Sequence, residues 1–107
     1  MTPTIGRIVL YRITPEEADK TNQRREDARQ QFPQMQRTRP GFQAHIGNPV
    51  SGGEVVPMIV TQVWPNEFGP DRPGVNGQAF LDGSDSLWVA SVEEGDGAGQ
   101  WSWPPRV

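Results

Sequence analysis

Aromatic and arginine side chains near the C-terminus are the residues of this sequence best suited to chemistry. Trp101 and Trp103 are separated by one residue, and two prolines and Arg106 follow them. Indole faces and an arginine fork can together hold a base and a phosphate in a closed pocket. We therefore select a candidate ligand site with four main members and three outer ones: Trp88, Trp101, Trp103 and Arg106, with Arg7, Tyr11 and His45.

The tryptophans also have a purely structural interpretation, because the chain is short of large apolar residues. Only 34% of its 107 residues are hydrophobic. Large aromatic side chains near a terminus ordinarily bury or bind something, so we expect residues 99–106 to fold back onto the domain. On this interpretation Trp101 and Trp103 close one open end of the domain beside the 75–92 hairpin, and Arg106 alone would serve a ligand without helping the core.

Catalytic and metal-binding patterns are absent from the sequence. It contains no cysteine and a single histidine, His45, which excludes disulfides, thiolate catalysis and cysteine-rich or histidine-rich metal sites. The acids in predicted loops, such as Asp82 and Glu93, have no basic or histidine partner nearby, whereas paired catalytic carboxylates need a defined separation across a cleft. We therefore expect a protein that is not an enzyme and needs no metal or cofactor.

Charge is divided unevenly along the chain. Residues 20–39 carry six basic residues against two acids, whereas residues 66–96 carry seven acids against one arginine. Such a chain could self-associate head to tail or present its basic segment to an anion, although two solvated faces are the simpler interpretation. The net charge of −3 and the acidic strand-rich half disfavour long nucleic acid. No apolar run is long enough to cross a bilayer and no signal pattern is present, so we expect no membrane contact.

The elements that must position these residues are mostly short strands with tight turns, as 12 glycines and 11 prolines indicate. Pro57 lacks an amide hydrogen, so its strand should lie at an edge or carry a bulge nearby. Asp82-Gly83 is a strong hairpin signal between the last two strands. The apolar patterns predict five strands in all: 5–13, 42–46, 54–64, 75–82 and 86–92.

One helix is predicted after the first strand. Thr14 and Glu17 form a capping box, and Pro33 should end the helix near residue 31. Its inner stripe contains one large apolar group, so the helix should pack along one edge of the domain or project towards another subunit. The stripe consists of Ala18, Thr21, Arg25, Ala28 and Phe32.

These elements predict one domain over residues 1–107, because a chain of this length cannot hold two independent cores. The fold class is mainly β (α+β), a small SH3-like antiparallel β-barrel of about five strands with one inserted α-helix. An OB-like barrel is the alternative.

Three segments resemble small phage-encoded proteins of unknown function. They are residues 3–11, 57–61 and 101–106, and the phage proteins open G-R-I-V-x-Y, continue with a P-x-I-V strand and close W-x-W-P. Shorter relatives pass almost directly from the first strand to the P-x-I-V strand, so residues 14–53 resemble a helix-containing insertion on a minimal barrel. The resemblance implies a viral origin and an accessory or structural role.

Two functions are compatible with these observations. The first is a phage-encoded, non-enzymatic binding protein in the host cell cytoplasm, which sequesters a small anionic nucleotide-like host defence signal in a pocket of a homo-oligomer. The second is a virion component, associated with capsid or tail, that assembles through its edge strand and its dipolar charge. We favour the first, because a decoration protein gains little from a tryptophan cluster beyond the needs of its core.

Overall fold

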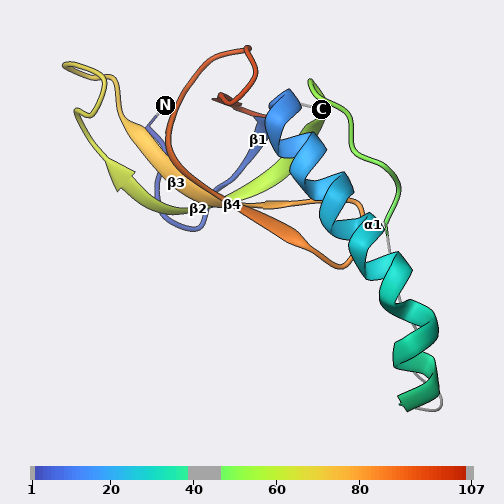
Figure 1. Ribbon diagram of the computed structural model, residues 1–107. Helices are drawn as coiled ribbons and strands as arrows, with labels where there is room; N and C mark the ends of the chain where they lie inside the picture. Colours follow the sequence, from blue (N-terminus) through green and yellow to red (C-terminus); the bar gives the residue numbers. More distant parts are fainter. Residues whose placement is uncertain (1, 39–46, 106–107) are drawn as a thin grey trace.

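The computed structural model describes the backbone of residues 2–38 and 47–105 and the side chains of residues 2–31 and 47–105. The predicted strand at 42–46 and the candidate site residues His45 and Arg106 lie outside this part of the chain. The described residues form one helix and five strands (Figure 1). Their bounds are β1 Ile8–Arg12, α1 Pro15–Thr38, β2 Val55–Trp64, β3 Gly74–Phe80, β4 Ser86–Glu93 and β5 Trp101–Ser102.

The strands form a single antiparallel sheet in the order β4-β3-β2-β1-β5, curled into a half-barrel. Its two edges approach each other, because Glu94, just after β4, forms an isolated bridge with Trp101 of β5. The amide of Gly95 donates to the Trp101 carbonyl at 2.9 Å in the same place. The predicted fold class, a small mainly β antiparallel barrel with an inserted helix, is confirmed.

The C-terminal stretch folds back onto the domain, as the sequence predicts, and supplies a short strand that the sequence does not predict. Tyr11 and Leu10 of β1 lie opposite Trp101 and Ser102 of β5. A strand of two residues is too short to show alternation, and the prolines that follow at 104 and 105 read as a stop signal.

β2 lies inside the sheet, so the predicted edge position of Pro57 is wrong. The amide of Val60 donates to the chain just before β1, and backbone groups alternate in direction along a strand, so the nitrogen of Pro57 faces β3. The ladder between β2 and β3 ends at Met58 opposite Ala79, and Pro57 therefore lies just outside it. A bulge is present between Val60 and Gln62, three residues further along.

The core fills the concave side of the sheet and includes the first part of α1. Its most completely buried large side chain is Trp101. Leu87, Val63 and Trp103 pack against this core from its margin. The buried members are Val9, Tyr11, Ile13, Ala18, Val50, Val56, Met58, Val60, Val75, Ala79, Leu81, Val89, Val92 and Trp101.

The start of α1 has the predicted capping box. The amide of Glu17 donates to Thr14 Oγ1 at 3.1 Å, and the amide of Thr14 donates to Glu17 Oε1 at 3.0 Å. The predicted end is wrong, because the helix continues through Pro33 to Thr38. An interior proline costs about 3 kcal/mol, but good helix formers, glutamine, methionine and arginine, follow this one.

Only the first half of α1 packs against the sheet. Ala18, Thr21 and Arg25 of the predicted inner stripe are buried, whereas Ala28 is exposed. The side chain of Phe32 lies outside the described residues. Beyond Arg25 the helix projects past the sheet (Figure 1).

Candidate ligand-binding site

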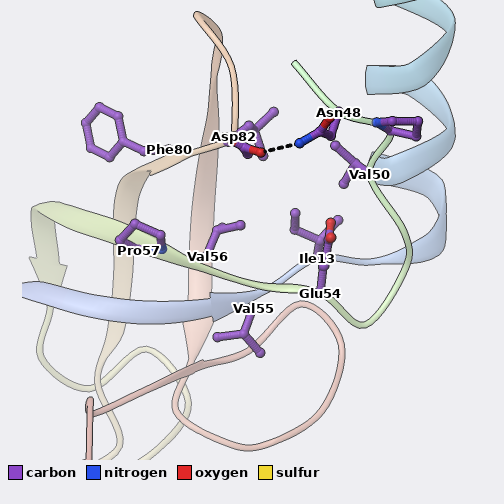
Figure 2. A pocket seen from close by; sticks show the side chains of 11 residues that line it. Ile13, Asn48, Val50, Glu54, Val55, Val56, Pro57, Phe80 and Asp82 are labelled. Atoms are coloured by element: carbon purple, nitrogen blue, oxygen red, sulfur yellow. Dashed lines mark hydrogen bonds between the residues drawn. The ribbon is translucent and has the colours of Figure 1, made fainter.

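A cavity of about 460 Å³ opens where β2 and β3 separate (Figure 2). The ladder between β2 and β3 ends at Met58 and Ala79, and the nitrogen of Pro57, which faces β3, has no hydrogen to donate to the next pair. The strands diverge from this point, and residues 48–50 form the remaining wall. Pro57 therefore lies at the point where the strands separate and lines the cavity.

The floor of the cavity is apolar. Ile13, Val50, Val56 and Leu81 line it and are buried members of the domain core. The mouth is formed by exposed apolar groups on the two separating strands, and these groups are Val55, Pro57 and Phe80. Such a lining favours a ligand with an apolar body, because most of the surface that it would bury is hydrocarbon.

The polar side chains at the cavity are two carboxylates, which accept hydrogen bonds, and the amide of Asn48. Asp82 Oδ2 accepts from Asn48 Nδ2 at 2.7 Å, shown as the dashed line in Figure 2. Glu54 lines the cavity near β2, and its Oε2 accepts from the amide of Ser51 at 3.2 Å. The described residues that line the cavity include these two carboxylates and no lysine or arginine. The site therefore favours a ligand that donates hydrogen bonds and disfavours an anion.

A buried arginine holds the walls of the cavity in place. Arg25 of α1 is 6% exposed, and its Nε and Nη2 donate to Asp85 Oδ2 and Oδ1 at 3.1 and 2.6 Å. Its Nη1 also donates to the carbonyl of Asn48. One guanidinium thus joins α1, the wall at 48–50 and the hairpin between β3 and β4.

This pairing shifts the pKa of both partners. Hydrogen bonds from Arg25 stabilise the charged carboxylate and lower the pKa of Asp85 to about 2, although partial burial opposes this. The hydrogen bond to Asp85 likewise raises the pKa of Arg25. Both groups are therefore ionised at neutral pH, and their ion pair joins α1 to the hairpin between β3 and β4.

Two further contacts fix the segment before β2. Asn22 of α1 donates from Nδ2 to the Val50 carbonyl at 2.7 Å and accepts from the Val50 amide at 2.8 Å. Gly47 lies so close to the hairpin that a Cβ atom there would be 1.7 Å from the carbonyl oxygen of Asp82. The glycine at 47 is thus required by close backbone approach.

Some residues of the site predicted from the sequence lie together, but away from this cavity. Trp101 is fully buried, and its ring meets that of half-buried Trp103 edge to face, with centroids 5.2 Å apart at 85°. The guanidinium of Arg7 lies 5.5 Å from the centroid of Trp103. These contacts match the structural interpretation, in which the two tryptophans close one end of the domain.

The other predicted members are dispersed. Tyr11 is buried in the core, and its hydroxyl donates to Glu17 at 2.8 Å; burial and this carboxylate raise its pKa. Trp88 is 57% exposed on the outer face of β4, on the side of the sheet opposite Trp101. The tryptophan and tyrosine members therefore do not line one pocket. Two features of the sequence could have indicated the observed cavity. They are the proline at position 57, inside a strand, and the glycine at position 47.

No protein-family model, curated protein or solved structure matches this chain. Among the helical residues that the structure describes, no segment is both long and apolar enough to span a membrane. Among the described side chains, those of residues 2–31 and 47–105, aspartates and glutamates form no group of three or more that could hold a metal ion.

Proposed function

We propose that this chain is a non-enzymatic binding protein and that the cavity between β2 and β3 is its ligand site. The observation that carries the proposal is the cavity itself, with its apolar floor and carboxylate acceptors. Its volume of about 460 Å³ lies in the usual range of small-molecule sites, roughly 300 to 1,000 Å³.

The chemistry of the cavity changes the ligand class proposed from the sequence, from a small anionic nucleotide-like molecule to an uncharged one. A nucleobase has an apolar face and donors along its edge, which proteins read by stacking and hydrogen bonds. Phe80 and Pro57 offer flat apolar groups at the mouth, and Asp82 and Glu54 offer acceptors. A phosphate would meet those carboxylates without a lining cation. The ligand is therefore a nucleoside or a similar uncharged planar molecule, and guanosine, with two adjacent donors, should bind best.

The proposal is tested by calorimetric titration of the full chain with adenosine, guanosine, cytidine and uridine and with their 5′-monophosphates. We expect each nucleoside that binds to bind more tightly than its monophosphate. No heat with any of the eight compounds would reject the proposal. Tighter binding of the monophosphates would reject this cavity as the ligand site. It would favour instead a site that contains arginine.

A charge reversal at the mouth sharpens this test. Glu54→Lys places a cation beside the ligand, whereas the matched control Glu94→Lys reverses an exposed acid that does not line the cavity. Glu54→Lys should raise the affinity for the monophosphate on the order of tenfold relative to the control, as expected for two nearby charge changes in a partly solvated site. Equal effects of both variants would show that only net charge matters.

The proposed biological setting rests on the resemblance to small phage proteins, which supports a viral origin and a place in the host cytoplasm. The alternative role, a virion component, is favoured by one observation: β4 lies at one end of the strand order of the described sheet, and its residues 86–90 carry no charge. Mass spectrometry of purified particles separates the two, because a virion component would be present in stoichiometric amount.

A further inference from the structure

The main chain of Val55 has hydrogen-bonding groups that point away from β1. In the ladder between β1 and β2, Val55 lies opposite Arg12, and the amide of Ile13 donates to the carbonyl of Glu54 at 2.8 Å. That bond marks Arg12 and Val55 as a pair that exchanges no hydrogen bonds, because bonded and non-bonded pairs alternate in an antiparallel ladder. Arg12 accordingly turns its own amide and carbonyl to the segment before β5. The N–H and C=O groups of Val55 therefore point towards β3.

On the β3 side, Val55 meets the cavity and not a strand. The ladder between β2 and β3 ends at Met58 and Ala79, and continuing its register places Asp82 opposite Val55. Val55 and Asp82 both line the cavity. Within the part of the chain that the structure describes, neither main-chain group of Val55 has a hydrogen-bond partner. A donor and an acceptor of one residue thus lie side by side, unpaired, in the wall of the cavity.

This donor and acceptor complement a particular kind of molecular edge. An extended residue presents its N–H and C=O in the same direction, as in the hydrogen-bonded pairs of a sheet. The matching edge carries an acceptor next to a donor, which describes an amide, a lactam or the Watson–Crick edge of a nucleobase. The opposite edge of guanine carries two acceptors, N7 and O6, and the carboxylates of Glu54 and Asp82 have no hydrogen to donate to them. The wall at Val55 therefore favours the Watson–Crick edge.

The side chains around the gap between the two strands lie in two layers. Val56 and Leu81 are buried on the concave side, whereas Pro57 and Phe80 are exposed on the outer side. All four residues line the cavity. A flat ring system that lies in the plane of the sheet, with one edge at Val55, therefore finds apolar groups on both of its faces. The layers and the unpaired main chain favour the same orientation of a planar ligand.

We infer that the main chain of Val55 holds the Watson–Crick edge of the ligand, in the way that a neighbouring strand would. The inference rests on the proposed function of the cavity and adds the group that selects the ligand. With guanosine, the N–H of Val55 donates to O6 and its C=O accepts from N1–H. The carboxylates of Glu54 and Asp82 remain as acceptors for the exocyclic amino group.

The first experiment changes the ligand and leaves the chain as it is. Calorimetry of the full chain compares guanosine with 1-methylguanosine, which lacks the N1 hydrogen, and with 7-deazaguanosine, which is altered only on the opposite edge. We expect 1-methylguanosine to bind about tenfold more weakly and 7-deazaguanosine to bind like guanosine. Equal affinity for guanosine and 1-methylguanosine would overturn the inference. Absence of guanosine binding would reject the proposed function and this inference with it.

The second experiment isolates Val55 from the carboxylates. In the free chain the amide of Val55 should exchange its hydrogen faster than that of Val56, which lies opposite Tyr11 in the ladder, and saturating guanosine should slow the exchange at Val55. Val55→Pro removes the N–H at a position that faces β3 as Pro57 does, and should weaken guanosine binding about tenfold, whereas the control Val55→Ala keeps the N–H and should bind more tightly than Val55→Pro. Guanosine binding that leaves the exchange at Val55 unchanged, or equal losses in the two variants, would overturn this inference and leave the proposed function standing.

Discussion

Replacing Asp85 with asparagine should destabilise the fold, because it leaves the buried guanidinium of Arg25 without its counter-charge. Pairing lowers the pKa of Asp85 from its ordinary 3.8 to about 2, and each tenfold change in proton affinity corresponds to about 1.4 kcal/mol. The charged form of Asp85 therefore contributes about 2 to 3 kcal/mol. The full cost of breaking a buried pair is about 3 to 5 kcal/mol, and partial exposure of Asp85 places this pair at the lower end.

The same pairing predicts how stability depends on pH. The folded-state pKa of Asp85 lies below its unfolded value, so the contribution is complete above about pH 4 and is lost as the pH falls towards 2. Urea unfolding of wild type and Asp85→Asn, followed by tryptophan fluorescence, should show a difference at pH 7 that shrinks between pH 4 and pH 2.

The control is Glu26→Gln, which removes an exposed acid paired with Arg29 along α1 at 2.9 Å. Exposed pairs of this kind contribute less than about 1 kcal/mol, so this variant should unfold near the wild-type midpoint. If the free energy of unfolding of Asp85→Asn also lies within about 0.5 kcal/mol of wild type at pH 7, the Arg25–Asp85 ion pair does not stabilise the fold.

Two further predictions concern the core. Trp101→Ala should lower the free energy of unfolding by about 3 to 5 kcal/mol, because the side chain is fully buried, and Trp103→Ala should cost clearly less, because its ring is half-buried; equal losses would contradict this arrangement. The chain has one tyrosine, so absorbance of the phenolate reports Tyr11 alone, and it should titrate above its ordinary pKa of 10.0. Tyr11→Phe should cost about 1 to 3 kcal/mol through the lost bond to Glu17, and phenolate formation near pH 10 in wild type would argue against that bond.

Local signals predicted the fold well wherever neighbouring residues decide the structure. The capping box at Thr14 and Glu17 depends on a turn of four residues, and the hairpin between β3 and β4 depends on a short loop, residues 81–85, that contains Asp82-Gly83, so both were predictable. The end of α1 was not predictable in this way, because continuation of the helix through Pro33 depends on the summed helix propensity of the residues that follow it.

The candidate site could be predicted only in part, because its residues meet through tertiary packing. Arg25 was recognised as part of an inner stripe, but its partner Asp85 is 60 residues away and belongs to another element. Of the two arrangements predicted from Pro57, the edge position is wrong, and a bulge is present nearby, between Val60 and Gln62. Trp101 was selected for its chemistry, although the lack of other large apolar residues assigns it to the core.

Amide chemical shifts can show whether the cavity between β2 and β3 binds an uncharged planar ligand. The full chain, labelled with ¹⁵N, is titrated with guanosine. We expect the shifts to concentrate at the non-proline residues among 48–50, 54–57 and 80–82, which line the cavity. Shifts confined to Arg7, Trp101 and Trp103, or no shifts at saturating guanosine, would contradict it.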